Sequence, residues 1–201
     1  MDPRTEAYAC LLVDCIAPEP GWQVLVRSQP PARPLIEEVS RELARRGVRA
    51  LVRLGFDSVG GVFVREAPIE LLDELCPIEI YEIESADSYM AIVAPENTRD
   101  GSDIPAERTG PRLQAMRRHH GPYLSDEKPW VGCYYPTAAA AQDAGMSVRA
   151  FEDFLYGAVL VDWEALRRTM ERIAERFDRA NRKSTRLNSS HIQKSRMPSS
   201  A

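Results

Sequence analysis

Two adjacent histidines, His119 and His120, are the residues before position 181 whose type is most typical of metal binding. A two-metal hydrolytic site needs several carboxylates and imidazoles that converge on ions about 4 Å apart. Side chains of neighbours on a helix point about 100° apart, so this pair cannot hold one ion from one helix face. Arg117 and Arg118, directly before the pair, repel a cation. The two histidines therefore indicate solvated surface and not a metal site.

The sequence lacks the common motifs for nucleotide binding and nucleophilic catalysis. Gly60 and Gly61 lie in GFDSVGGVFV, but neither G-x-G-x-x-G nor G-K-[ST] occurs, so we predict a hairpin-like turn there and not a phosphate loop. No G-x-S-x-G elbow is present, and Cys133 lies within an apolar stretch, so a nucleophilic role is not supported. Without a C-x-x-C pair, four cysteines are predicted to be buried small hydrophobic residues: Cys10, Cys15, Cys76 and Cys133.

Charge is distributed unevenly along the 201 residues. Five of the 26 basic residues and none of the 30 acidic residues follow position 180, so residues 1–180 carry a net charge of −9. A body this acidic repels phosphate backbones, which argues against nucleic-acid binding. No run approaches the ~18 apolar residues of a membrane span, and the first residues lack the layout of a signal peptide. We therefore expect no membrane association and a cytoplasmic location.

The elements that would position any site begin with a strand–helix–strand unit. Apolar spacing predicts a helix over 8–16, and strands are predicted at 22–27 and 48–54. Between these strands a helix over 34–46 is expected, with Gly47 as its C-terminal cap. Two strands joined by a helix through short links indicate a right-handed crossover and a parallel sheet.

Further strands are predicted at 89–94 and 130–135, with one helix among loops in 95–129. Residues 78–85 alternate carboxylates with apolar side chains, which is typical of a half-exposed strand or a helix edge. Residues 162–179 form a last helix with an apolar stripe that either packs on the domain or awaits a missing partner. The predicted fold class is α/β, a small parallel-type sheet flanked by helices and ending in a long amphipathic helix.

The stretch that starts at Tyr135 has a complete structural interpretation. Pro136 would end the strand, because proline fixes φ and lacks an N–H. Thr137 would cap a helix over 138–144 that closes at Gly145, and Ser147 would cap the next helix. A role in contacting substrate is the alternative, because loops after parallel strands often form sites.

Three stretches together carry a family resemblance. They are APENTR at 94–99, WVGCYYPT at 130–137, and AQDAGMS at 141–147 followed by FEDF at 151–154. They resemble the thermophilic-type metallo-aminopeptidases called aminopeptidase T, S or II, and the opening stretch from residue 8 also looks like the start of that family. The resemblance covers residues 8–162.

The resemblance implies a cytosolic homodimer that releases N-terminal residues from peptides. In the family two divalent ions, zinc, cobalt or manganese, are held by Glu, His, Tyr and Asp in a C-terminal domain. Those positions do not exist in this sequence, so no catalytic or metal-binding residue is carried over and no metal is expected to bind. Residues of the shared motifs, for which a structural role is expected before substrate contact, are Glu96, Asn97, Tyr135, Pro136, Thr137, Gln142, Gly145, Met146, Ser147 and Glu152.

The last 20 residues differ from the rest in composition. Residues 182–201 are basic and rich in serine, which predicts a disordered segment. Residues 183–191 back-translate into a common sequencing adapter, and residues 195–201 into its continuation. We therefore interpret residues 182–201 as an adapter-derived, non-native tail, and residues 1–181 as an N-terminal α/β domain.

Two functions remain open from the sequence. The first is the truncated N-terminal part of a metal-dependent aminopeptidase, a hydrolase by family whose fragment is inactive without its catalytic domain. The second is a stand-alone α/β binding or interaction module without catalysis, with a genuine tail. Fold resemblance alone does not decide between them.

Overall fold

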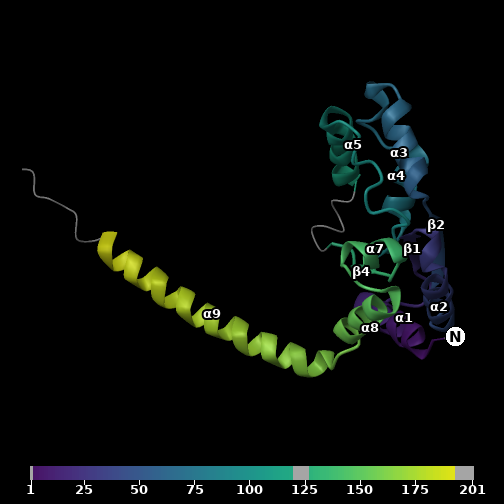
Figure 1. Cartoon of the computed structure of the whole chain (residues 1–201). Coiled ribbons are helices and arrows are strands. Elements are labelled where there is room, and N and C mark those ends of the chain that lie inside the picture. The colour runs from purple at the N-terminus through teal and green to yellow at the C-terminus, as the bar shows by residue number, and fades with distance from the viewer. Residues whose placement is uncertain (1, 120–126, 193–201) are drawn as a thin grey trace, which may run out of the picture. The chain divides into compact units, whose positions relative to one another are not determined.

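The computed structural model describes residues 2–119 and 127–192, and from residue 180 onward only the backbone (Figure 1). Two compact units are present, residues 1–160 and residues 161–201. The division lies about 20 residues before the boundary at 181/182 that composition suggested. None of the described helices is long and apolar enough to cross a membrane.

The first unit is built on a parallel sheet, as the crossover pattern predicted. Its strands among the described residues are β1 (Gln23–Ser28), β2 (Arg49–Leu54), β3 (Ser88–Val93) and β4 (Trp130–Tyr134). They pair in the order β2-β1-β3-β4, and every pairing is parallel. The α/β prediction is confirmed.

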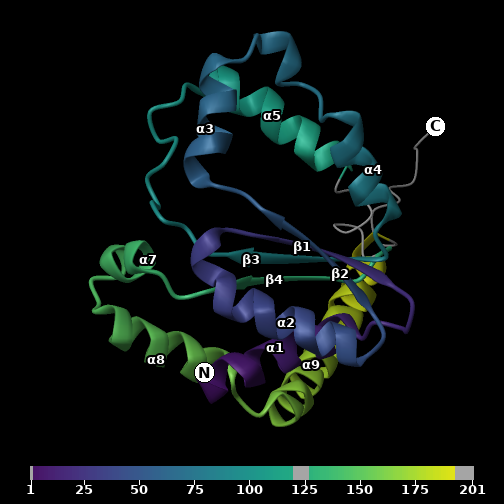
Figure 2. The ribbon, with the colours of Figure 1, turned by 90° about the vertical axis from the view of Figure 1, so that its right-hand side faces the viewer.

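Helices cover both faces of this sheet (Figure 2). α1, α2 and α8 lie on one side, and α3, α4 and α5 on the other. The helical elements of the unit are α1 (Pro3–Ile16), η1 (Pro30–Ala32), α2 (Arg33–Arg45), α3 (Asp57–Glu66), η2 (Ile69–Leu71), α4 (Pro77–Ser85), α5 (Ala106–His119), α7 (Ala138–Asp143) and α8 (Val148–Val159).

Each face of the sheet has its own hydrophobic core. Val24 and Val26 of β1 belong to the larger cluster with α1 and α2. Leu25, between them, belongs to a smaller cluster with Ile83 of α4 and Ala115 of α5. Successive strand residues point to opposite faces, so a strand covered on both sides is apolar without alternation. This explains why the run Val24–Val26 carries no two-residue period.

Helix α2 begins and ends one residue before its predicted range, and Gly47 follows it as predicted. Gly47 adopts a positive φ of 74° directly after α2, a conformation that glycine allows without strain. In α1 the buried face includes Ala9 and Val13, and Cys15 is exposed at its edge. Cys76 is also exposed, and Cys10 and Cys133 are partly buried, so the prediction of four buried cysteines was wrong.

The predicted turn at Gly60 and Gly61 was wrong, because both residues lie inside α3. β2 is an edge strand, and its neighbour β1 runs parallel to it, so a tight hairpin after β2 has no strand to join. The chain must cross to β3, and α3 and α4 form that connection. Residues 78–85, left open between strand and helix, belong to α4, with Ile83 buried.

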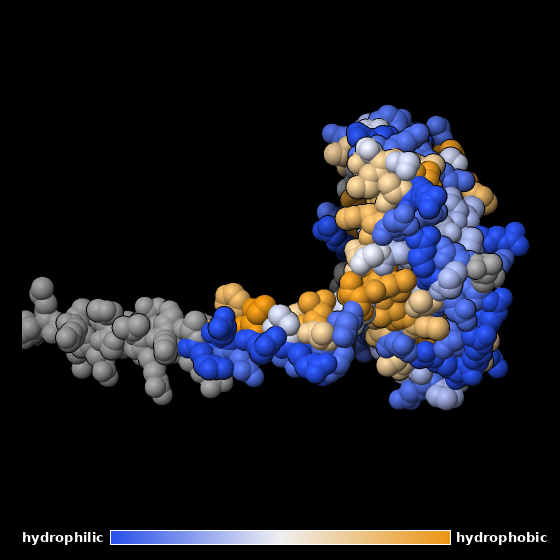
Figure 3. All heavy atoms as spheres, turned by 60° about the horizontal axis from the view of Figure 1, so that its bottom comes forward, coloured by the Kyte–Doolittle hydropathy of each residue, from blue (hydrophilic) through white to orange (hydrophobic). Residues whose placement is uncertain are grey.

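The second unit consists of α9 (Trp163–Ile192) among the described residues. The helix continues beyond residue 181, where an irregular segment was predicted, while residues 193–201 of that segment lie outside the described part of the chain. Hydrophobic residues follow one side of α9 (Figure 3). This stripe is exposed within the unit and comprises Trp163, Leu166, Met170, Ile173 and Phe177.

Candidate functional site at the carboxyl edge of the sheet

The order of the strands creates a topological switch point between β1 and β3. After β1 the chain enters α2 on one face of the sheet, and after β3 it enters α5 on the other. Because the two connections leave in opposite directions, a crevice opens at the carboxyl ends of the two strands. Ligands in open α/β sheets bind in such crevices.

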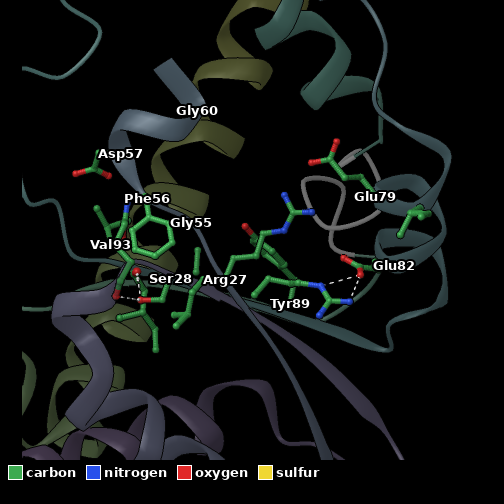
Figure 4. Close-up of a pocket in the computed structure, with 16 residues that line it drawn as sticks. Arg27, Ser28, Gly55, Phe56, Asp57, Gly60, Glu79, Glu82, Tyr89 and Val93 are labelled. Carbon is green, nitrogen blue, oxygen red and sulfur yellow. Dashed lines mark hydrogen bonds and ion pairs between the residues drawn. The ribbon is translucent and has the colours of Figure 1, made fainter. Parts of the chain in front are cut away.

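A pocket of about 740 Å³ lies at this edge, on the side of α3 and α4 (Figure 4). It takes its floor from the last residues of β1, β2 and β3, and its walls from the loop after β2 and from α4. Charged and large apolar or aromatic side chains line it, among them Arg27, Arg53, Phe56, Ile78, Glu82 and Tyr89.

Polar side chains join the strand ends behind this pocket. The Ser28 hydroxyl donates to the carbonyl oxygen of Ile92 at 2.8 Å, and the Gln29 side-chain oxygen accepts from the N–H of Ala94 at 2.7 Å. Both contacts bridge β1 and the end of β3. The Asp57 carboxylate, at the start of α3, accepts from the N–H of Glu96 at 2.8 Å. These bonds hold the loop 94–99 against the edge of the sheet.

Two arginines occupy neighbouring positions on the pocket floor, since Arg27 of β1 is in register with Arg53 of β2. Arg53 binds Glu82, with 2.7 Å between Nε and the carboxylate. Hydrogen bonding from Arg53 lowers the pKa of Glu82, against a smaller opposing effect of burial. By contrast, the Nε of Arg27 is buried and has no hydrogen-bond partner among the described residues.

The motif after β4 is built as its residue types predicted. Thr137 accepts from the N–H of Ala140 at 3.2 Å and caps α7. Gly145 has a φ of 66°, which ends α7. Ser147 accepts from the N–H of Ala150 at 3.2 Å and caps α8. Pro136 is buried beside Thr137. Thr137, Gly145 and Ser147 therefore have structural roles in this fold.

Helix α8 packs against α1 through buried aromatic side chains. The Tyr8 hydroxyl donates to the carbonyl oxygen of Tyr134 at 3.2 Å, and its ring meets Tyr156 edge-on at 6.0 Å. The hydroxyls of Thr5 and Tyr156 are 3.2 Å apart. Burial raises the pKa of Tyr135, with smaller effects from Tyr156 and Glu152. This packing fixes the loops after β4 relative to the sheet.

The structure brings only some of the ten motif residues together. Glu96 and Asn97 follow β3, and Tyr135–Thr137 follow the adjacent β4, so both groups lie at one edge of the sheet. A weak ion pair of 3.9 Å between Arg99 and Asp143 links the first loop to α7. Gln142 and Met146 are exposed. None of the ten residues lines the pocket.

Arg27 is one of several lining residues that no sequence motif marked. The sequence could have indicated Arg27, because this charged residue directly follows the apolar run Val24–Val26 in a predicted strand. Which strand lies beside it, and whether a carboxylate reaches it, depends on long-range packing. The sequence pattern shows neither the neighbouring strand nor the position of a carboxylate.

Metal ligands are not assembled in the described part of the chain, where no group of three or more His, Cys, Asp or Glu side chains lies close enough to hold an ion. These residues therefore offer no donor set for a pair of divalent ions. His119 is partly buried at the end of α5, and His120 lies outside the described residues. Burial raises the pKa of Cys133 to about 11, so its thiol is protonated at neutral pH.

Comparison with known proteins finds a family and similar solved structures. A family model described as thermophilic metalloprotease (M29) matches residues 1–201. Among solved structures, the fold is similar to wild-type AmpT from Thermus thermophilus, with a TM-score of 0.69 and 21% sequence identity over 89% of this chain. The match covers 49% of that chain, so the present chain spans about half its length. No curated protein matches. By its family match, the chain belongs to the thermophilic metalloprotease (M29) family.

Proposed function

We propose that this chain is the N-terminal part of a metal-dependent aminopeptidase that releases N-terminal residues from peptides. The observation that carries the proposal is the combination of a family match over 1–201 with coverage of half of a solved relative. The specific motif stretches at 94–99 and 130–147 add to it. In this proposal the catalytic half lies beyond residue 181, and residues 182–201 are adapter-derived.

The proposed whole enzyme takes its two divalent ions, zinc, cobalt or manganese, on a segment that this sequence does not contain. The described residues would supply a scaffold for that segment. The 201-residue chain is then inactive and binds no catalytic metal. A cytoplasmic homodimer is the proposed assembly, because the family resemblance implies one.

The test is to read the source DNA across the codon for Asn181 and to express the longest continuous frame. We expect a frame that continues for several hundred bases and encodes clustered Glu, His, Tyr and Asp. The extended protein should hydrolyse a leucyl-anilide with added cobalt, and the 201-residue chain should not. Activity of the 201-residue chain under the same conditions would contradict the proposed inactivity.

One observation favours the alternative of a binding module. Residues 1–160 form a compact unit with a hydrophobic core on each face of the sheet and a pocket at its edge. A genomic frame that encodes residues 182–201 and then stops would support this alternative and would end the aminopeptidase proposal for this chain.

A further inference from the structure

We propose that the pocket at the switch point between β1 and β3 binds a small organic monocarboxylate. Arg27 would hold the carboxylate, and the apolar body of the ligand would lie against Phe56 and Ile78. The proposal does not depend on peptidase activity, because it concerns binding to the 201-residue chain without a metal.

Arg27 has hydrogen-bonding capacity that the described residues do not use. An arginine stays charged at any physiological pH, and a buried hydrogen-bond donor without a partner costs free energy. Its Nε is buried and lacks a hydrogen-bond partner in the described part of the chain. Glu82 acts on Arg27 only through a weaker electrostatic interaction and is hydrogen-bonded by Arg53. A guanidinium in this state has donors left for an external anion.

The pocket provides space around the Arg27 guanidinium. On β3 the residue in register with Arg27 is Ala91, whose methyl group leaves room above the sheet. The pocket of about 740 Å³ falls within the range of small-molecule sites, roughly 300–1,000 Å³. Its position at the switch point is where the topology opens a crevice. The arginine therefore has room for a ligand beside it.

An apolar surface lies beside Arg27 in the pocket. Three large hydrophobic side chains that line the pocket are exposed, Leu54 by 51%, Phe56 by 54% and Ile78 by 71%. Figure 4 shows Arg27 and Phe56 among the side chains around the pocket. Apolar walls with one convergent charged group are typical of a site for a small organic ion.

The charges nearby favour a carboxylate over a phosphate. Asp57, Glu79 and Glu82 also line the pocket, and they would repel a dianion. Arg53 offsets Glu82, and Arg112, 3.5 Å from Glu79, offsets the second carboxylate. Asp57 accepts from the backbone N–H groups of Glu96 and Asn97. In the described part of the chain Arg27 then keeps an Nε without a hydrogen-bond partner, and one guanidinium can hold one carboxylate. The planar fork of a guanidinium fits the two oxygens of a carboxylate.

The experiment is calorimetric titration of the 201-residue chain with 3-phenylpropionate, with its neutral analogue 3-phenylpropionamide, and with inorganic phosphate. We expect saturable binding of the carboxylate, and binding of the amide and of phosphate that is weaker by at least about tenfold. Arg27→Met should abolish carboxylate binding. Arg27→Lys, which keeps the charge but loses the fork, should weaken it.

Arg49→Met is the matched control, because Arg49 is an exposed arginine at the opposite end of the neighbouring strand β2. It should bind the carboxylate as the parent chain does. Circular dichroism checks that each variant folds. If Arg27→Met does not fold, the binding measured for Arg27→Lys tests the proposal. Equal binding of acid and amide, tighter binding of phosphate, unchanged binding by a folded Arg27 variant, or no binding by the folded parent would each overturn the proposal.

Discussion

At the scale of single residues, two hydroxyl groups start the helices that follow β4. The Ser147 hydroxyl accepts from the N–H of Ala150 at the start of α8. Ser147→Ala should lower the free energy of unfolding by about 1 kcal/mol, since one N–H of the first turn loses its acceptor. Urea denaturation measures the change.

Thr109→Ala is the control for the capping variant. The Thr109 hydroxyl donates to the carbonyl oxygen of Ala106 within α5, a contact that does not satisfy a helix end. Alanine has the higher helix propensity, so this variant should be neutral or slightly stabilising. Equal destabilisation by both variants would argue against the capping role of Ser147.

A second residue-scale prediction concerns acid stability. Hydrogen bonding from Arg53 lowers the pKa of Glu82 in the folded state, so Glu82 contributes stability above its unfolded pKa and loses it as the pH falls through the folded pKa. Glu82→Gln should therefore cost about 0.5–1 kcal/mol at pH 7 and less below about pH 4. Urea midpoints measured from pH 3 to pH 7 test this.

Glu84→Gln is the matched control for the acid-stability experiment, because Glu84 lies on the exposed side of the same helix. It should change the urea midpoint little at every pH in the series. A Glu82→Gln penalty that is the same at pH 3 and pH 7 would show that the ion pair is not its source.

At the scale of elements, α3 is the clearest test of the crossover between β2 and β3. A Cβ at Gly60 would meet no atom within 4 Å, and the φ of Gly60 is not positive. Because Gly60 lies within α3, Gly60→Ala should stabilise the protein by about 0.5–1 kcal/mol, since alanine loses less backbone entropy on folding. Thermal or urea unfolding provides the measurement.

Gly61→Ala is the comparison within the same helix. A Cβ there would lie 2.7 Å from a guanidinium nitrogen of Arg65 and 3.1 Å from the Asp100 carboxylate. Arg65 also binds Asp103, so its displacement would disturb that ion pair. Gly61→Ala should therefore stabilise less than Gly60→Ala or destabilise. Strong destabilisation by Gly60→Ala would favour the turn that the sequence suggested.

At the scale of the whole molecule, the division after Leu160 predicts independent folding of the first unit. Both hydrophobic cores consist of residues up to Leu160. A chain that ends at Leu160 should unfold cooperatively, with a free energy within about 0.5 kcal/mol of that of the full chain. Urea denaturation of the two chains makes the comparison. A truncated chain that is unfolded or loses several kcal/mol would show that α9 stabilises the first unit.

The local elements were largely available from the sequence. Strands at 22–27 and 130–135, the helix that Gly47 ends, and the caps Thr137 and Ser147 follow from side-chain chemistry and spacing within about ten residues. Such signals are strong where a proline, a glycine or a hydroxyl group has one conformational use. The family stretches at 94–99 and 130–147 are likewise a property of the sequence alone.

The failures have one physical cause in common. Gly60 and Gly61 suggested a turn because two glycines weaken a helix, yet an edge strand with a parallel neighbour requires a helical crossover. Cys15 was predicted to be buried because the chain has no C-x-x-C pair and cysteine packs like a small hydrophobic residue, yet the face that α1 buries includes Ala9 and Val13 instead. In both cases packing against distant elements decided the outcome.

The pocket, like these elements, could not be predicted from the sequence. By itself the sequence determined the α/β class, the parallel sheet and the family. The tertiary structure decided that β1 lies between β2 and β3 and that Arg53 binds Glu82. It also decided that Arg27 lines a pocket, with an Nε that has no hydrogen-bond partner among the described residues. The partner of a charge and the position of a crevice depend on which strands become neighbours, and that choice is made by contacts between residues more than 20 positions apart.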